Sequence, residues 1–232
     1  MSRLASFISS EDKGRLSKRK IIIKGILFYL RSLFVLIGIV LSLILILNLF
    51  NVDTTSLKYP LDSEKSELRE KGILYMLFLV VFFGPLIEEL SFRLGLSFQR
   101  KHVAISAAAM AYMLSSVLSG SGYFQDIPSK LVLSIVVGLF LYGIGQKTFD
   151  NIQQKHAKTI LWIMILLFGF IHVLNYEIEL LALLPMYFVM CLPQVLMGIV
   201  FTYFRLNLGF IYCLGFHCLL NGISFILSWL TL

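Results

Sequence analysis

Residues 32–47 read SLFVLIGIVLSLILIL, a stretch that contains no charged side chain. The apolar character extends on both sides of it, over residues 21–50. A helix needs ~20 mostly apolar residues to cross the ~30 Å hydrocarbon core of a bilayer, and this stretch is long enough. It therefore predicts a first membrane-spanning helix, which we expect also to target and anchor the chain.

The composition of the whole chain agrees with that stretch. Of 232 residues, 58% are hydrophobic and 14% are charged, against about 25% charged in an ordinary soluble domain. The mean hydropathy is +0.87. A soluble domain of this size could not bury so much apolar surface, and disordered, fibrous and disulfide-stapled classes are excluded by the same composition. We conclude that this is an integral membrane protein.

Further apolar segments follow the first along the chain. We expect an all-α, polytopic transmembrane helical bundle of about seven spans, within bounds of six to eight, forming a single domain over residues 21–232 after a basic cytoplasmic tail at residues 1–20. The polar segments 119–129 and 146–158 are expected to be loops. The remaining expected spans are residues 72–99, 102–118, 131–145, 159–175, 180–204 and 208–232.

The distribution of Lys and Arg predicts the orientation. With the N-terminus inside, the tail and the inner loops hold most of the basic residues, as the positive-inside rule requires. The net charge of +7 then reflects membrane topology, and we expect no nucleic-acid partner. We expect a multi-pass protein of a bacterial plasma membrane, with a cytoplasmic N-terminus and an external C-terminus.

A charge near the centre of a bilayer costs at least ~2.5–3.5 kcal/mol, so polar residues inside spans are candidates for function. Lys24 and Arg31 lie near the start of the first span, where they can snorkel to the interface. The other candidates are Glu88, Glu89, Arg93, His172, His217 and Asn221.

The segment GPLIEELSFR, residues 84–93, holds three of these candidates. Glu89 and Arg93 are four residues apart with the acid first, the favourable order for a helical ion pair. Glu88 is rotated about 100° from Glu89, with no cation at helical spacing in the motif, so its setting suits a general base. Pro85 predicts a kink just before the acids. A plain ion-pair network at a helix end is the competing interpretation.

The histidines and asparagine are weaker signals singly. His172 could be an interfacial histidine. His217 and Asn221 are four residues apart on one helix face, and they could form hydrogen bonds to a neighbouring helix. Estimated from the 1.5 Å helical rise, Glu88 lies roughly 10 Å and both histidines roughly 15 Å from the cytoplasmic boundary. We therefore expect the candidates to meet in the cytoplasmic half of the bilayer. The cysteines at 191, 213 and 218 are expected to be core thiols.

Three motifs together resemble the CPBP (CAAX protease and bacteriocin-processing, or Abi) family of intramembrane proteases. The family pattern E-E-x-x-x-R, F-x-x-x-H and H-x-x-x-N is similar to EELSFR at 88–93, FGFIH at 168–172 and HCLLN at 217–221. The resemblance covers about residues 72–225. It implies a glutamate-dependent endopeptidase in which Glu88 and His172 activate a water, His217 and Asn221 stabilise the oxyanion, and Glu89 and Arg93 support the motif.

This sequence departs from the family pattern in two places. Leu94 follows the arginine where the family more often has glycine, and the first two motifs are farther apart than in many members. Residues 102–158 therefore look like an inserted helix pair. Substrate access is the feature that such an insertion would change.

The resulting hypothesis is an intramembrane endopeptidase whose partners are a peptide or protein substrate near the cytoplasmic membrane face and the bilayer itself. The alternatives are a non-catalytic immunity or scaffold protein of the same fold, and a proton-coupled transporter with Glu88 and the histidines as a relay. The expected cofactor is none, since no His-Glu-x-x-His is present. Zinc held by Glu88, His172 and His217 is the alternative.

Overall fold

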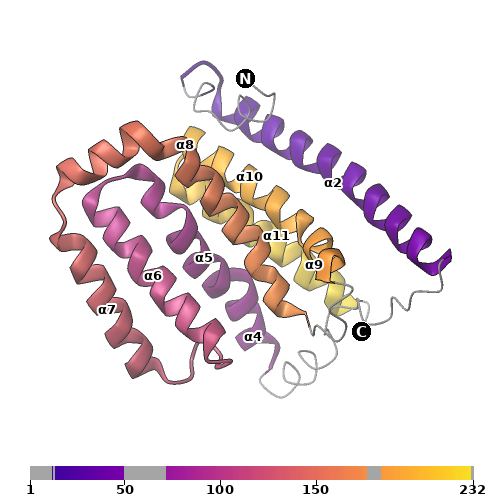
Figure 1. Cartoon of the computed structure of the whole chain (residues 1–232). Coiled ribbons are helices and arrows are strands. Elements are labelled where there is room, and N and C mark those ends of the chain that lie inside the picture. The colour runs from indigo at the N-terminus through magenta and orange to yellow at the C-terminus, as the bar shows by residue number, and fades with distance from the viewer. Residues whose placement is uncertain (1–11, 13, 50–71, 177–183, 231–232) are drawn as a thin grey trace. The chain divides into compact units, whose positions relative to one another are not determined.

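The computed structural model describes residue 12 and residues 14–49, 72–176 and 184–230 (Figure 1). Within these residues the chain is helical and contains no strand, which confirms the all-α prediction. Six helical segments there are long and apolar enough to cross a membrane. The chain thus has the features of a multi-pass membrane protein built as a helical bundle.

The helices follow the expected order. Their bounds are α2 (Lys18–Leu49), α4 (Ile73–Met76), π-helix η3 (Leu77–Phe83), α5 (Gly84–Phe92), 3-10 helix η4 (Leu94–Ser97), α6 (Arg100–Leu118), α7 (Ile127–Gly143), α8 (Gln146–Phe170), 3-10 helix η5 (Ile171–Asn175), α9 (Leu184–Met190), α10 (Leu192–Asn207) and α11 (Phe210–Leu230). The loop predicted at residues 119–129 is shorter in the structure, because α7 begins at Ile127. The segments 50–71 and 180–183 lie outside the described residues.

One expectation about these elements needs correction, and two expected spans contain irregular turns. Residues 146–158 were expected to form a loop, yet they are the first half of α8. Phe149 in that segment is 5% exposed, so an apolar side chain anchors an otherwise polar helix surface. The second span is not one uniform α-helix, because a π-helix precedes Pro85 and a 3-10 turn follows Arg93. The sixth expected span is interrupted by a turn at Cys191, two residues before Pro193.

The chain divides into two compact units. The first contains residues 1–76 and 165–209, and the second contains residues 77–164 and 210–232. In the first unit α2 packs against α10, and a core of five buried residues joins η5, α9 and the following turn, namely Val173, Tyr176, Met186, Tyr187 and Cys191. Asp12 accepts hydrogen bonds from Lys24 and from the Tyr203 hydroxyl in the same unit, which ties the chain just before α2 to α10.

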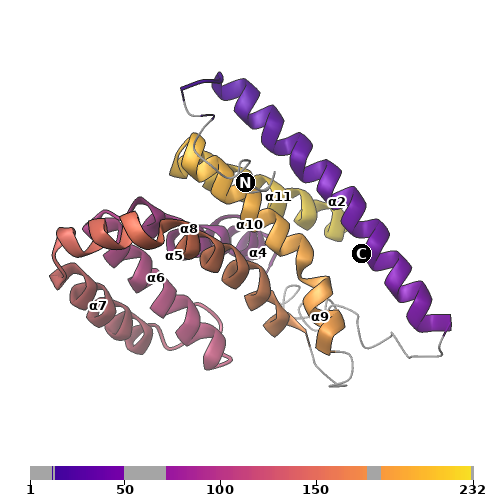
Figure 2. The same cartoon turned by 45° about the horizontal axis from the view of Figure 1, so that its top comes forward.

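In the second unit α6 packs against both α5 and α7, and α11 packs against η3 and α5. Figures 1 and 2 show α6 and α7 side by side in both views. Ser106 of α6 donates to the Ser91 carbonyl of α5 at 2.6 Å, and a Cβ at Gly95 would lie 2.9 Å from the Ser106 oxygen. The absence of a side chain at Gly95 therefore allows the close approach of η4 to α6, directly after residues 88–93.

Gly169, near the end of α8, marks a second close contact, here within the first unit. A Cβ at this position would lie 2.7 Å from Cα and 2.8 Å from the backbone nitrogen of Val195 in α10. Since backbone atoms cannot move aside cheaply, we expect Gly169→Ala to destabilise the protein by about 1–3 kcal/mol. Gly38→Ala in α2 is the control, because a Cβ there meets no atom within 4 Å and alanine favours helix by up to ~1 kcal/mol. Unfolding of both variants in detergent measures the difference, and equal stabilities would contradict the contact.

Candidate functional site

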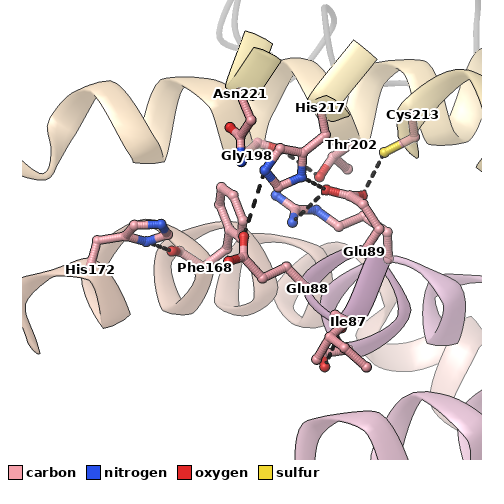
Figure 3. A network of polar contacts seen from close by, with 12 residues as sticks. Ile87, Glu88, Glu89, Phe168, His172, Gly198, Thr202, Cys213, His217 and Asn221 are labelled. Atoms are coloured by element: carbon pink, nitrogen blue, oxygen red, sulfur yellow. Dashed lines mark hydrogen bonds and ion pairs between the residues drawn. The ribbon is translucent and has the colours of Figure 1, made fainter. Parts of the chain in front are cut away.

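Glu89 lies at the centre of a buried polar cluster between α5 and α11 (Figure 3). Its side chain is fully buried, and its carboxylate accepts hydrogen bonds from three donors. Arg93 Nη1 and His217 Nδ1 donate to Oε1 at 3.2 Å and 2.8 Å, and Cys213 Sγ donates to Oε2 at 2.7 Å. The predicted Glu89–Arg93 ion pair is thereby confirmed. A buried carboxylate with a cation and two further donors is held as the acceptor-only, ionised form.

His217 lies between the two adjacent acids. With Nδ1 directed at Glu89, its Nε2 atom is 3.7 Å from Oε2 of Glu88. That separation is too long for a direct hydrogen bond but short enough for an ion pair with a protonated ring. The Glu89 carboxylate selects the tautomer with the proton on Nδ1, which leaves Nε2 as the nitrogen that can accept or donate a proton on the Glu88 side.

The two glutamates have different surroundings although they are neighbours in sequence. The Glu88 side chain is 21% exposed, whereas that of Glu89 is 0% exposed. The 100° rotation per helical residue explains this, because it directs the two side chains to different faces of α5. Glu89 therefore belongs to the buried support of the cluster, and Glu88 is the more exposed of the two carboxylates.

Asn221 contacts the π-helix that precedes the two acids. Its Nδ2 donates to the Val80 carbonyl at 3.0 Å. In a π-helix that carbonyl would accept from the N–H five residues later, but the residue there is Pro85, which has none. The Asn221 amide thus donates to the Val80 carbonyl in place of the N–H that Pro85 lacks. The same contact ties α11 to η3. Through this contact Asn221 stabilises the packing of α11 on η3. That Asn221 also stabilises an oxyanion stays a prediction.

His172 lies in η5, at the end of the helix formed by α8. Its Nδ1 is 2.8 Å from the Phe168 carbonyl, and the two rings are in edge contact with centroids 5.4 Å apart. His172 belongs to the first compact unit, whereas Glu88, Glu89, His217 and Asn221 belong to the second. The expectation that His172 joins Glu88 therefore stays a prediction.

Two residues had no predicted role at this site. Cys213 was expected to be a core thiol and is buried, and it also donates to Glu89. Its position four residues before His217 and eight before Asn221, on one helix face, was the available signal. The second is Tyr123, in the α6–α7 turn. Burial raises the pKa of Tyr123, and the nearby negative charge of Glu88 raises it further.

Two contacts within its own unit hold Tyr123 in place. Tyr112 donates its hydroxyl to the Tyr123 carbonyl at 2.5 Å, and the Phe83 ring makes an edge contact with the Tyr123 ring at 5.6 Å. A phenol kept neutral near a carboxylate can serve as a hydrogen-bond donor. No spacing rule in a single sequence would have related a turn tyrosine to this cluster.

The cysteines of α11 provide a matched pair for testing the cluster. Cys213→Ala leaves one oxygen of the buried Glu89 carboxylate without its thiol donor, so we expect a loss of about 1–3 kcal/mol of stability. Cys218→Ala removes a thiol of the same helix that is only partly buried, and its expected effect is smaller than ~0.5–1 kcal/mol. Denaturant titration of the two variants in detergent compares them. Equal losses would show that the Cys213–Glu89 contact contributes nothing specific.

Among the described residues, no group of three or more His, Cys, Asp and Glu side chains is arranged to hold a metal ion. The prediction that the site uses no metal stays a prediction. No protein-family model matches this chain, and neither a curated protein nor a solved structure is significantly similar to it. The site must therefore be interpreted from its own geometry and chemistry.

Proposed function

We propose that the chain is an intramembrane endopeptidase in which Glu88 activates a water molecule. The observation that carries the proposal is the position of His217, with Nδ1 fixed by the buried Glu89 and Nε2 3.7 Å from Glu88. An accessible carboxylate beside an oriented imidazole is a usual arrangement for general acid–base chemistry. The resemblance of residues 88–93, 168–172 and 217–221 to the CPBP motifs supports the same reaction.

In the proposed reaction, Glu88 takes a proton from a water while the water oxygen attacks the carbonyl carbon of the scissile peptide. His217 Nε2, in its protonated form, would donate to the developing oxyanion. When the tetrahedral intermediate collapses, the C–N bond breaks and the proton on Glu88 passes to the leaving amine. Glu89 and Arg93 take no part in bond making, and their role is to hold the imidazole in one tautomer and orientation.

His172 and Asn221 enter the proposal on different grounds. The CPBP resemblance implies that His172 assists Glu88 and that Asn221 stabilises the oxyanion. The contact of Asn221 with the Val80 carbonyl uses one amide hydrogen, and the second amide hydrogen would serve the oxyanion. Their variants are therefore informative only after activity has been established with the unmodified chain.

The direct test uses the purified full-length chain in detergent with a library of membrane-derived peptides, analysed by mass spectrometry. We expect discrete new termini and, in H₂¹⁸O, one heavy oxygen in each new carboxyl group. A chelator should leave the rate unchanged, and loss of activity that zinc restores would favour the metal-dependent alternative. If no peptide is cleaved and vesicles containing the chain instead show coupled proton uptake, the transporter hypothesis replaces the protease.

We further propose that the N-terminus is cytoplasmic and that the membrane is the plasma membrane of a bacterium. The support is the excess of Lys and Arg in the tail and in alternate loops. Labelling of single cysteines introduced near Lys147 and Asp126, from each side of sealed vesicles, tests the orientation. The proposal requires that the two positions react from opposite sides.

A further inference from the structure

An apolar groove lies between α6 and α7 in the second unit. Its volume is about 780 Å³, within the ~300–1,000 Å³ usual for ligand pockets. Among its lining residues, Lys101 is the charged one, and the others are mainly aliphatic and aromatic. The lining includes Lys101, Ala108, Tyr112, Ile135, Gly138 and Tyr142.

The groove has the length of one lipid leaflet. Along α6 it extends from Lys101, in the first turn, to Tyr112. Eleven helical steps of 1.5 Å give about 16 Å, and half of a ~30 Å hydrocarbon core is about 15 Å. α6 is itself a candidate span, so Lys101 would lie near a membrane boundary and Tyr112 near the bilayer centre. Those dimensions suit an acyl chain that enters the groove from one membrane surface.

The packing of α6 on α7 explains why the groove exists. A Cβ at Gly138 would lie only 3.2 Å from the Ala108 Cβ, so small residues allow the two helices to touch there. At the rim, Ile105 and Ile135 are 47% and 56% exposed, and they leave the groove open at its side. The α7 helix has 17 residues, about 25 Å, so it is shorter than the hydrocarbon core that its neighbours can span.

One end of the groove is basic. Lys101 is exposed, and the adjacent Arg100 places its guanidinium 4.3 Å from the centroid of the Tyr142 ring, which lines the same end. The side chain of Gln146 accepts a hydrogen bond from the Arg100 N–H at 2.7 Å, and the exposed Lys147 is the next residue in the chain. Asp150 is also close, where it accepts a hydrogen bond from Gln146 Nε2 at 2.8 Å.

We propose that this groove binds one anionic phospholipid, with an acyl chain between α6 and α7 and the phosphate at Lys101 and Arg100. The positive N-terminal end of the α6 dipole adds to the attraction. A zwitterionic lipid offers the same chain without the net charge. The inference does not depend on the proposed peptidase chemistry, because no residue of the Glu88–His217 cluster lines the groove.

The test is a lipid titration of the purified full-length chain in neutral detergent, followed by native mass spectrometry. Phosphatidylglycerol and phosphatidylcholine with identical chains are the two probes. We expect one phosphatidylglycerol to be retained with at least ~5-fold preference, and Lys101→Gln to weaken it by ~5-fold, since one basic residue near a membrane surface contributes that much. Lys155→Gln is the matched control, because Lys155 is exposed on α8 and does not line the groove.

Two further experiments distinguish the contribution of the acyl chain to binding from that of the headgroup. Glycerol phosphate, which has no acyl chain, should not compete at the same concentrations, because most of the affinity comes from buried CH₂ groups. Ile135→Trp, which covers the rim, should reduce lipid retention without changing charge. A photoactivatable acyl chain should cross-link to peptides from α6 and α7 in the unmodified chain, which makes this arm independent of whether any variant folds.

Three results would overturn the proposal. These are equal retention of the two lipids, an equal effect of the Lys101 and Lys155 substitutions, and cross-links confined to α2. The last would mean that the lipid associates only with the most lipid-exposed surface of the chain, since none of the apolar window of α2 is buried.

Discussion

Glu88→Gln should lower peptide cleavage by ~10²–10⁴-fold, the usual contribution of a general base. The amide keeps the shape of the side chain and one acceptor oxygen, so its place beside His217 Nε2 is retained while its basicity is lost. Because Glu88 is 21% exposed, the substitution should leave the fold intact, as circular dichroism and detergent unfolding can verify. The rate is measured with the peptide that the unmodified chain cleaves best.

The control for this variant is Asp150→Asn, which neutralises an exposed carboxylate on α8 that accepts a hydrogen bond from Gln146. It should leave the rate within a factor of about two, since it changes the same charge away from the cluster. An unchanged rate for Glu88→Gln would end the general-base role of Glu88. A comparable loss for both variants would attribute the effect to net charge.

Arg93→Met should produce the largest loss of stability, about 3–5 kcal/mol. Arg93 is 1% exposed and pairs with the fully buried Glu89, so its removal leaves a buried carboxylate without its cation. Cys213 and His217 still donate to that carboxylate, but neither supplies a permanent charge. Unfolding in mixed micelles, followed by circular dichroism, measures the loss.

Arg31→Met is the matched control, because Arg31 is an exposed arginine within α2. It should change stability by less than ~0.5 kcal/mol. The double variant Glu89→Gln with Arg93→Met should be more stable than Arg93→Met alone, because the remaining amide oxygen still accepts from His217 without an uncompensated charge. If Arg93→Met and Arg31→Met behave alike, the buried pair does not stabilise this fold.

The errors of the sequence analysis have a common physical cause. The segment 146–158 was interpreted as a loop because it is polar and basic, yet polarity reports contact with water and not backbone conformation. A polar helix that buries one apolar side chain, here Phe149, extends beyond the region that hydropathy detects. Pro85 was expected to kink a helix, and the structure adds that it follows a π-helix whose Val80 carbonyl accepts a hydrogen bond from Asn221.

The all-α membrane fold and the Glu89–Arg93 pair could both be predicted from the amino-acid sequence alone. Both are local properties: hydropathy adds up over ~20 consecutive residues, and an i, i+4 contact follows from the helical repeat alone. The position of His217 between the two glutamates, and that of Cys213 beside Glu89, depend on how the helices pack. Those contacts join residues far apart in the chain, and they depend on how each helix is rotated about its axis and which faces pack, which no local pattern specifies.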